Sequence, residues 1–155
     1  MIKINVITNN IIWYRFIKKP NNYIDKKVKK INLKTKGFLK RKLFCTLLLS
    51  GSKEIKFLNK KFRKKNKTTD VLSFPFNTKK DLNNILKKEK EIYLGDIIIN
   101  LNKIKNIRDP KNFKKAFDNL WVHGLVHLFG HDHKKEKDSQ KMNKIEKKYI
   151  SLIND

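Results

Sequence analysis

The sequence predicts an α+β fold in a single domain spanning residues 1–155. Some segments have the alternating or continuous apolar residues typical of strands, and others have apolar residues three or four positions apart, typical of amphipathic helices. Because the two kinds are interspersed, we expect a central mixed sheet of about four strands with helices packed on it. No internal repeat and no Gly/Ser-rich or Pro-rich linker divides the chain.

The first half of the chain contains two strand patterns and two helix patterns. The strands are Ile2–Thr8 and Leu43–Leu49, and the helices are Tyr23–Lys42 and Glu54–Lys65. Within the first helix, Ile24, Val28 and Ile31 have helical spacing, and a second apolar set follows near Phe38 and Leu39. A turn at residues 50–52 supplies the residues that cap the second helix.

The second half repeats both patterns. The strands are Val71–Phe76 and Tyr93–Asn100, and the helices are Asn112–Phe129 and Lys135–Ile150. The polar, charged segment Asn77–Glu91 predicts a mobile loop or a short helix between the strands. The Asn112–Phe129 helix is the most apolar, and Gly130 is expected to end it. In the last helix Met142, Ile145 and Tyr149 form the stripe that packs on the core.

The composition is strongly basic, with a net charge of +25. Clustered cations bind phosphate, so this charge is compatible with an RNA partner. Only four of the 39 basic residues are arginines, and Asn and Ile are abundant beside Lys. An AT-rich genome produces the same composition on any surface that tolerates it. The charge therefore permits a nucleic-acid partner without requiring one.

The sequence shows no signal for secretion or membrane insertion. Its longest apolar run, Leu43–Leu49, is too short to span a bilayer, and residues 1–10 lack the apolar core of a secretory signal. Cys45 is the only cysteine, so no internal disulfide forms, and its apolar surroundings favour a buried side chain over a reactive thiol. We expect a cytoplasmic protein that does not associate with membranes.

All four histidines lie within residues 123–133. His123 and His127 are one helical turn apart, so both imidazoles can reach one ion from the same helix face. Gly130 can reverse the chain in a left-handed conformation and bring His133 to the same ion. Three neutral nitrogens with an open fourth position are typical of a catalytic zinc site, so one Zn²⁺ per chain is expected. The alternative is a set of unrelated core or surface histidines.

Two further residues of the cluster are assigned different roles. His131 is expected to point away from the ion and is not chosen as a ligand. Asp132 is a candidate to orient an imidazole N–H group by accepting its hydrogen bond. The alternative for Asp132 is an ordinary turn residue.

The spacing His-x-x-x-His-x-x-Gly-x-x-His matches that of metzincin metalloproteases except at one position. The proteases have a glutamate directly after the first histidine, where it acts as general base. Here that position is Gly124, which has no side chain. The metal site is therefore protease-like, but the usual peptidase mechanism lacks its proton acceptor.

Residues 123–133 resemble the histidine signature of the YbeY family, bacterial endoribonucleases and ribosomal RNA maturation factors, with Val126 in place of a leucine. Three further parts of the chain fit the family: Leu58-Asn59 and Phe62-Arg63 leading to Thr69–Phe76, the segment Leu94–Ile98, and Asp138, Met142 and Glu146 at four-residue spacing. Thr68 stands where the family usually has proline. The resemblance extends from about residue 43 to the end, and more loosely over the first 42 residues.

The resemblance implies an α+β fold with a zincin-like metal helix and one zinc per subunit. It implies cleavage of single-stranded RNA in 16S rRNA 3′-end maturation and a role in ribosome quality control. It also implies ribosomal RNA, the small ribosomal subunit, ribosomal proteins and an assembly GTPase as partners.

Arg63 is the candidate catalytic residue outside the histidine cluster. RNA phosphodiesters are anionic, and a guanidinium group binds phosphate through two parallel hydrogen bonds. The alternative is a solvated cation at a helix end. By family position Asp96 and Ser73 are expected near the cleft, although Ser73 is explained more simply as a strand residue.

Two other functions compete with a zinc-dependent endoribonuclease. One is a zinc peptidase or another small-substrate hydrolase, which Gly124 and the basic surface disfavour. The other is a non-catalytic RNA-binding factor for ribosome assembly whose zinc is structural. An open fourth coordination position would distinguish the enzyme from this second alternative.

Overall fold

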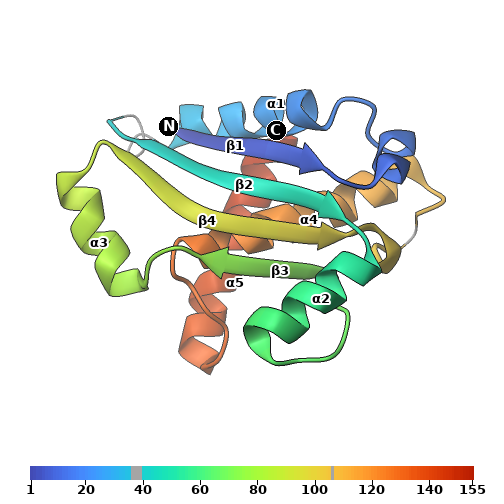
Figure 1. Ribbon diagram of the computed structural model, residues 1–155. Coiled ribbons are helices and arrows are strands. Elements are labelled where there is room, and N and C mark those ends of the chain that lie inside the picture. Colours follow the sequence, from blue (N-terminus) through green and yellow to red (C-terminus); the bar gives the residue numbers. More distant parts are fainter. Residues whose placement is uncertain (36–39, 106) are drawn as a thin grey trace.

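The computed structural model describes residues 1–35, 40–105 and 107–155, which contain a four-stranded mixed sheet (Figure 1). The strands are β1 (Ile2–Thr8), β2 (Lys42–Ser50), β3 (Val71–Pro75) and β4 (Glu91–Asn100), in the spatial order β1-β2-β4-β3. The β1–β2 and β2–β4 pairs are parallel, whereas β3 runs antiparallel to β4. The predicted α+β class with a mixed sheet is therefore confirmed.

Besides the strands, the described residues form five α-helices and short 3₁₀ turns. The helices are α1 (Pro20–Lys34), α2 (Ser52–Arg63), α3 (Lys79–Lys88), α4 (Pro110–Leu128) and α5 (Glu136–Asn154), and the 3₁₀ turns include η1 (Ile11–Arg15) and η3 (Leu101–Lys103). Figure 1 shows α1, α4 and α5 behind one face of the sheet, while the other face is open toward the viewer. Among the described residues, no helix is both long enough and apolar enough to cross a bilayer.

The alternation of apolar residues determines which face of the sheet receives the helices. Ile2, Ile4 and Val6 of β1 are buried, and the residues between them are exposed. In β2, Leu43 and Leu47 are buried on the same face. This face forms the main core with the apolar sides of α1, α4 and α5. Helix α2 covers only part of the opposite face, where its Ile55 packs on Leu72 and Ile98.

The structure differs from the sequence prediction at two places, and at a third it decides between the two predicted alternatives, a loop or a short helix. The first helix begins at Pro20 and ends at Lys34, and the apolar pair Phe38 and Leu39 lies outside the described residues. The segment 77–91 contains the helix α3, which Thr78 caps and Leu82 anchors in the core. The 3₁₀ turn η1 was not predicted, because a single anchoring residue has no periodicity. That anchor is Trp13, whose indole N–H donates to the Ser50 carbonyl at 2.9 Å.

Helix α4 lies in the centre of the molecule, between the sheet and α5. Asp109 caps its first turn, and Phe113, Phe117 and Trp121 are fully or nearly fully buried along it. The helix contacts β3, β4 and α5. Because these buried aromatic side chains fix its position, the polar residues of its last turns are held at the end of β3.

Candidate metal centre

Three histidines converge at the C-terminal end of α4. The ligand nitrogens of His123, His127 and His133 all lie within 4.8 Å of one another. The Nε2 atoms of His123 and His127 are 3.1 Å apart, as the one-turn spacing on a helix requires. The His133 ring lies 5.2 Å from that of His127 and 5.8 Å from that of His123, measured between ring centroids. The arrangement places three imidazoles around one point.

The turn after α4 delivers the third histidine. Gly130 has a φ of 80°, in the left-handed region that favours glycine. Its N–H donates to the His127 carbonyl at 2.8 Å, which closes the helix end. A Cβ atom at this position would lie 2.8 Å from the Cβ of Lys79. The glycine therefore permits both the chain reversal and the close approach of α3.

Hydrogen bonds on the opposite ring nitrogens determine which atoms face the centre. Nδ1 of His123 lies 2.8 Å from the Glu146 carboxylate on α5, and Nδ1 of His127 lies 2.9 Å from the His131 carbonyl. Because both partners are acceptors, each Nδ1 carries the ring proton. The Nε2 lone pairs of the two rings are then directed toward each other without a proton between them. A cation placed there would satisfy both.

The electrostatic environment keeps His127 neutral. Burial, together with the neighbouring His123, lowers the pKa of His127 to about 4. The neutral imidazole is the form that binds a metal ion. Three converging imidazoles, two of which are oriented by a hydrogen bond at Nδ1, fit a divalent transition metal such as zinc.

Arg63, His127 and His133 line one cleft of about 890 Å³. Arg63 is the last residue of α2, and its Nη2 donates to the Ser73 carbonyl of β3 at 3.1 Å. The guanidinium carbon also lies 5.8 Å from the centre of the Phe74 ring. The cleft is lined further by Ser73 and by Lys79 at the start of α3. A phosphate in this cleft would meet the arginine and two of the imidazoles.

Gly124 faces the sheet. A Cβ atom at this position would lie 2.6 Å from Cγ2 of Ile97 on β4. The glycine therefore allows α4 to pack closely against the sheet. The Cβ atom of a glutamate at position 124 would clash with Ile97, so this chain has no space for the protease general base at that position.

The other candidate residues, Asp132, His131 and Asp96, lie in different surroundings. Asp132 accepts from the His133 backbone N–H at 2.7 Å and lies 3.2 Å from Lys134 Nζ, so these contacts are with the turn and not with an imidazole ring. The ring of His131 lines the cleft but is not part of the three-nitrogen group. Asp96 is not among the described residues that line the cleft. It lies on the open face of the sheet, where it accepts from the Tyr93 hydroxyl at 2.5 Å.

Glu146 occupies the position expected for a residue that orients a ligand. Its contact with His123 joins α5 to α4. In the sequence Glu146 stands out because it lies four residues after Met142, on the same side of the helix. This spacing does not reveal which residue it contacts. Glu146 could have been found by searching the sequence for an acidic residue on the inner side of the last helix, where it can accept a hydrogen bond from a candidate ligand histidine.

The sequence was compared with those of known protein families and proteins. The model of the family "Endoribonuclease YbeY" matches residues 12–154. Endoribonuclease YbeY of Pelagibacter ubique is 44% identical over 149 residues, covering 94% of this chain and 92% of the relative. The proteins of the same name from Thermodesulfovibrio yellowstonii and Ehrlichia canis are 35% and 33% identical, and the alignments cover 83% and 99% of this chain and 76% and 93% of the relatives.

The fold has a counterpart among solved structures. The solution structure of a protein from Thermotoga maritima superposes with a TM-score of 0.58 at 27% sequence identity, covering 99% of this chain and 89% of that one. The sequence resemblance noted at the histidines is thus matched along nearly the whole length. The chain belongs to the Endoribonuclease YbeY family.

Proposed function

We propose that this protein is a zinc-dependent, single-strand-specific endoribonuclease that acts in 16S rRNA 3′-end maturation and ribosome quality control. The observation that carries the proposal is the convergence of His123, His127 and His133 at a cleft that His127 and His133 line together with Arg63. Membership in a family named for endoribonuclease activity supports it.

Zinc is the metal proposed, because three imidazoles with an open fourth position match its catalytic sites. When bound, such an ion acts as a Lewis acid that polarises a phosphoryl oxygen and makes water more acidic. The protein itself supplies the geometry. Glu146 and the His131 carbonyl hold the proton on Nδ1 of two rings, and Gly130 positions the third.

Arg63 is proposed as the group that binds the phosphodiester beside the metal. Its contact with the Ser73 carbonyl uses one donor of the guanidinium and orients the side chain along the edge of β3. The other donors are available for phosphate oxygens. Asp132 is proposed as a turn residue that holds the His133 backbone in place through its hydrogen bond.

The two competing functions are less well supported. A peptidase of the metzincin kind would need a general base at position 124, where a side chain would meet Ile97. A structural zinc site would need a fourth protein ligand. In the part of the chain that the structure describes, the group of candidate ligands contains three residues.

The wider role of the protein is proposed with the same family. Residues 1–155 are proposed to form one domain that recognises ribosomal RNA and the small ribosomal subunit in the cytoplasm. Ribosomal proteins and an assembly GTPase are the proposed protein partners. The net charge of +25 favours association with RNA.

Cleavage of single-stranded RNA tests the proposed activity most directly. The zinc-loaded protein is expected to cleave a labelled single strand and to leave the same sequence intact in a duplex. Single-turnover rates on the two substrates, with a casein digest beside them, separate the nuclease from the peptidase. Release of peptides without cleavage of either RNA would reject the proposal.

Arg63 should determine the rate of that reaction. Because Lys supplies charge without the two-donor fork, Arg63→Lys should retain part of the activity. Arg63→Glu should lower the rate roughly a hundred- to thousandfold, the usual cost of losing one charge-assisted contact in a transition state. Arg15→Glu is the matched control, because it makes the same change of charge at an exposed residue of η1 outside the cleft. Equal rates for the two glutamate variants would remove Arg63 from the site.

Glu146 should determine the affinity for metal. Glu146→Gln keeps the shape of the side chain but removes the charged acceptor from Nδ1 of His123. We expect roughly ten- to hundredfold weaker metal binding, as is typical when such an outer partner is lost. Competition with a chromophoric chelator measures this affinity. Glu89→Gln, at the exposed end of α3, is the control and should bind metal like the wild type.

A further inference from the structure

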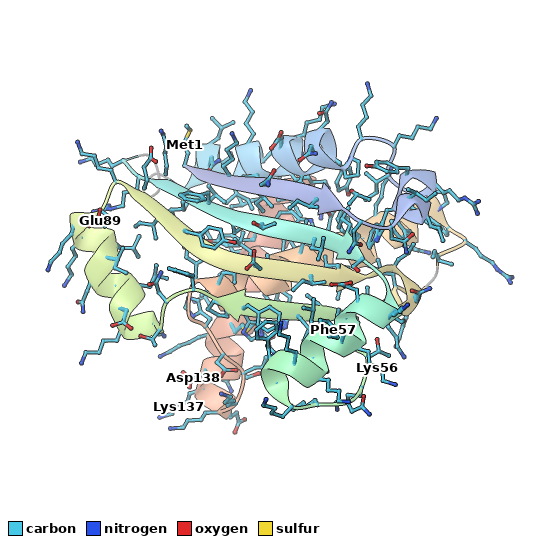
Figure 2. All side chains as sticks on the ribbon, viewed as in Figure 1. Met1, Lys56, Phe57, Glu89, Lys137 and Asp138 are labelled. Atoms are coloured by element: carbon cyan, nitrogen blue, oxygen red, sulfur yellow. The ribbon has the colours of Figure 1, made fainter. Side chains whose placement is uncertain are left out.

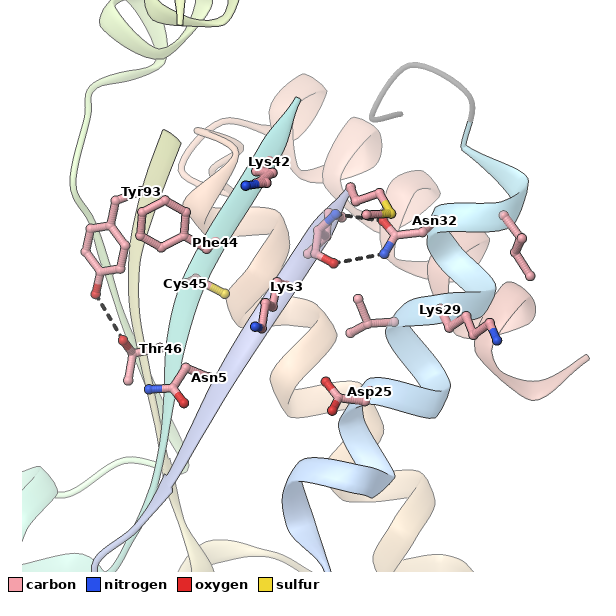
Figure 3. Close-up of a pocket in the computed structure, with 14 residues that line it drawn as sticks. Lys3, Asn5, Asp25, Lys29, Asn32, Lys42, Phe44, Cys45, Thr46 and Tyr93 are labelled. Atoms are coloured by element: carbon pink, nitrogen blue, oxygen red, sulfur yellow. Dashed lines mark hydrogen bonds between the residues drawn. The ribbon is translucent and has the colours of Figure 1, made fainter. Parts of the chain in front are cut away.

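The open face of the sheet has a row of three aromatic rings. Phe44 of β2 and Tyr93 of β4 lie with ring centroids 5.4 Å apart, and Phe76, which directly follows β3, lies 5.6 Å from Tyr93. Figure 3 shows Phe44 and Tyr93 projecting from the side of the sheet opposite α1. We refer to Phe44, Tyr93 and Phe76 as the aromatic row.

The rings of the aromatic row are too exposed to belong to the core. Phe44 is 41% exposed and Phe76 is 72% exposed, although both are large apolar side chains. Tyr93 is fixed between them, because its hydroxyl donates to Asp96 and lies 3.2 Å from the Thr46 hydroxyl. An ordered central ring with exposed rings on both sides is a preformed surface.

The aromatic row is continuous with the proposed catalytic cleft. Phe76 lines the cleft together with Arg63 and His127. At the other end, Phe44 and Tyr93 line a hollow of about 910 Å³ at the β1 edge of the sheet (Figure 3). The row therefore connects the metal centre to this hollow across β4 and β2.

The charges around the row favour a polyanion. Lys3, Lys29 and Lys42 border the hollow that Phe44 lines, with Lys42 paired to Glu91, and Lys79 borders the cleft that Phe76 lines. Asp25 is the acidic residue among the described residues that line the hollow, beside three lysines there; on the open face Asp96 accepts from the Tyr93 hydroxyl, and Glu91 is paired with Lys42 at 2.5 Å. Cations at both ends of the aromatic row could bind the phosphates of a single RNA strand, and the aromatic faces between them could stack on its bases.

We propose that the aromatic row is a stacking platform on which unpaired bases of the RNA lie while the neighbouring phosphodiester enters the cleft. This inference rests on the proposed endoribonuclease function and adds the means by which a single strand is selected. Bases stack on aromatic side chains only when they are unpaired and splayed, and every base has a π-face, so the platform distinguishes single strands from duplexes without reading sequence.

Binding of an RNA that resists cleavage tests the platform separately from catalysis. The probe is a fluorescent single strand of mixed sequence with methylated 2′-hydroxyls, titrated with full-length, zinc-loaded protein, and a gel confirms that the strand stays intact. Phe44→Leu and Phe76→Leu keep the apolar bulk of exposed positions and remove the aromatic face. Each should raise Kd roughly five- to hundredfold, the usual range for loss of one stacked base.

Three comparisons identify stacking as the cause. The slope of affinity against salt should stay unchanged, because no cation is removed. A strand with abasic sites should bind the wild type and the leucine variants equally. Phe44→Trp and Phe76→Trp should retain the wild-type affinity. Phe57→Leu is the matched control, since Phe57 is 59% exposed on α2, outside the row (Figure 2), and should bind like the wild type.

The emission of 2-aminopurine placed in the strand gives a direct readout, because stacking on a ring quenches it. Quenching should occur with the wild type and be reduced with the leucine variants. Unchanged Kd and unchanged quenching in both leucine variants would overturn the proposal that the aromatic row stacks on RNA bases. The open face would then be a candidate surface for a protein partner. Equal losses for the leucine and tryptophan variants would also overturn it. If the strand binds as proposed but the zinc-loaded protein does not cleave ordinary RNA, the proposed function fails while the platform stands.

Discussion

His127→Ala is expected to abolish both metal binding and RNA cleavage. It removes one of the three nitrogens that lie within 4.8 Å of one another, on a ring whose Nδ1 is held by the His131 carbonyl. Zinc content should fall from about one per chain to a small fraction, because two imidazoles are too few for a stable site. Since the ion is expected to contribute several kcal/mol to charge stabilisation in the transition state, cleavage should fall by roughly a thousandfold or more.

Elemental analysis and single-turnover cleavage measure the two effects, and His123→Ala should behave in the same way. His131→Asn is the matched control, because it changes a histidine of the same turn whose ring is outside the three-nitrogen group. It should retain the metal, since the contact that it makes to His127 comes from its backbone. Loss of zinc from His131→Asn, or full zinc in His127→Ala, would show that the ligand set is wrong.

Asp118→Ala is expected to cause the largest loss of stability. Asp118 is 3% exposed on α4 and receives hydrogen bonds from Trp121 Nε1 at 2.9 Å, Lys27 Nζ at 2.8 Å and the Tyr23 hydroxyl at 3.1 Å. Without the carboxylate these donors are left buried or half-buried without their acceptor. Removing one partner of a buried ion pair typically costs about 3–5 kcal/mol, a large part of the roughly 5–15 kcal/mol that stabilises a domain.

Urea unfolding followed by tryptophan fluorescence measures the free energy of unfolding of this variant. The control is Asp25→Ala, which removes an equal charge from the exposed side of α1 and should change the stability by less than about 0.5 kcal/mol. Similar unfolding midpoints for the two variants would mean that the contacts of Asp118 do not stabilise the fold. Because α4 holds two of the proposed ligands, the Asp118 variant should also bind metal more weakly at temperatures near its unfolding transition.

The local elements of this protein follow from its sequence because their periodicity is a property of the backbone. Alternating residues in Ile2–Thr8 face opposite sides of any strand, and that strand has the predicted bounds. His123 and His127 share a face of any helix, and Gly130 permits the reversal that follows. The convergence of three nitrogens could therefore be predicted from the local geometry of residues 123–133, without knowledge of their long-range contacts.

The remainder of the site depends on packing between segments that are distant in the sequence. The contact of Glu146 with His123 exists only because α5 packs on α4, and Arg63 enters the cleft only because β3 adds to the sheet antiparallel to β4 beside the end of α4. The lack of a side chain at position 124 is likewise explained by close packing against Ile97 of β4, which is distant in the sequence. Such pairings result from the burial of many apolar side chains at once, and no local pattern specifies which distant residue completes them. The sequence alone determined the three histidines and Arg63 as candidates, and the tertiary structure decided which acid contacts His123, where the guanidinium group lies and which rings lie at the entrance of the cleft.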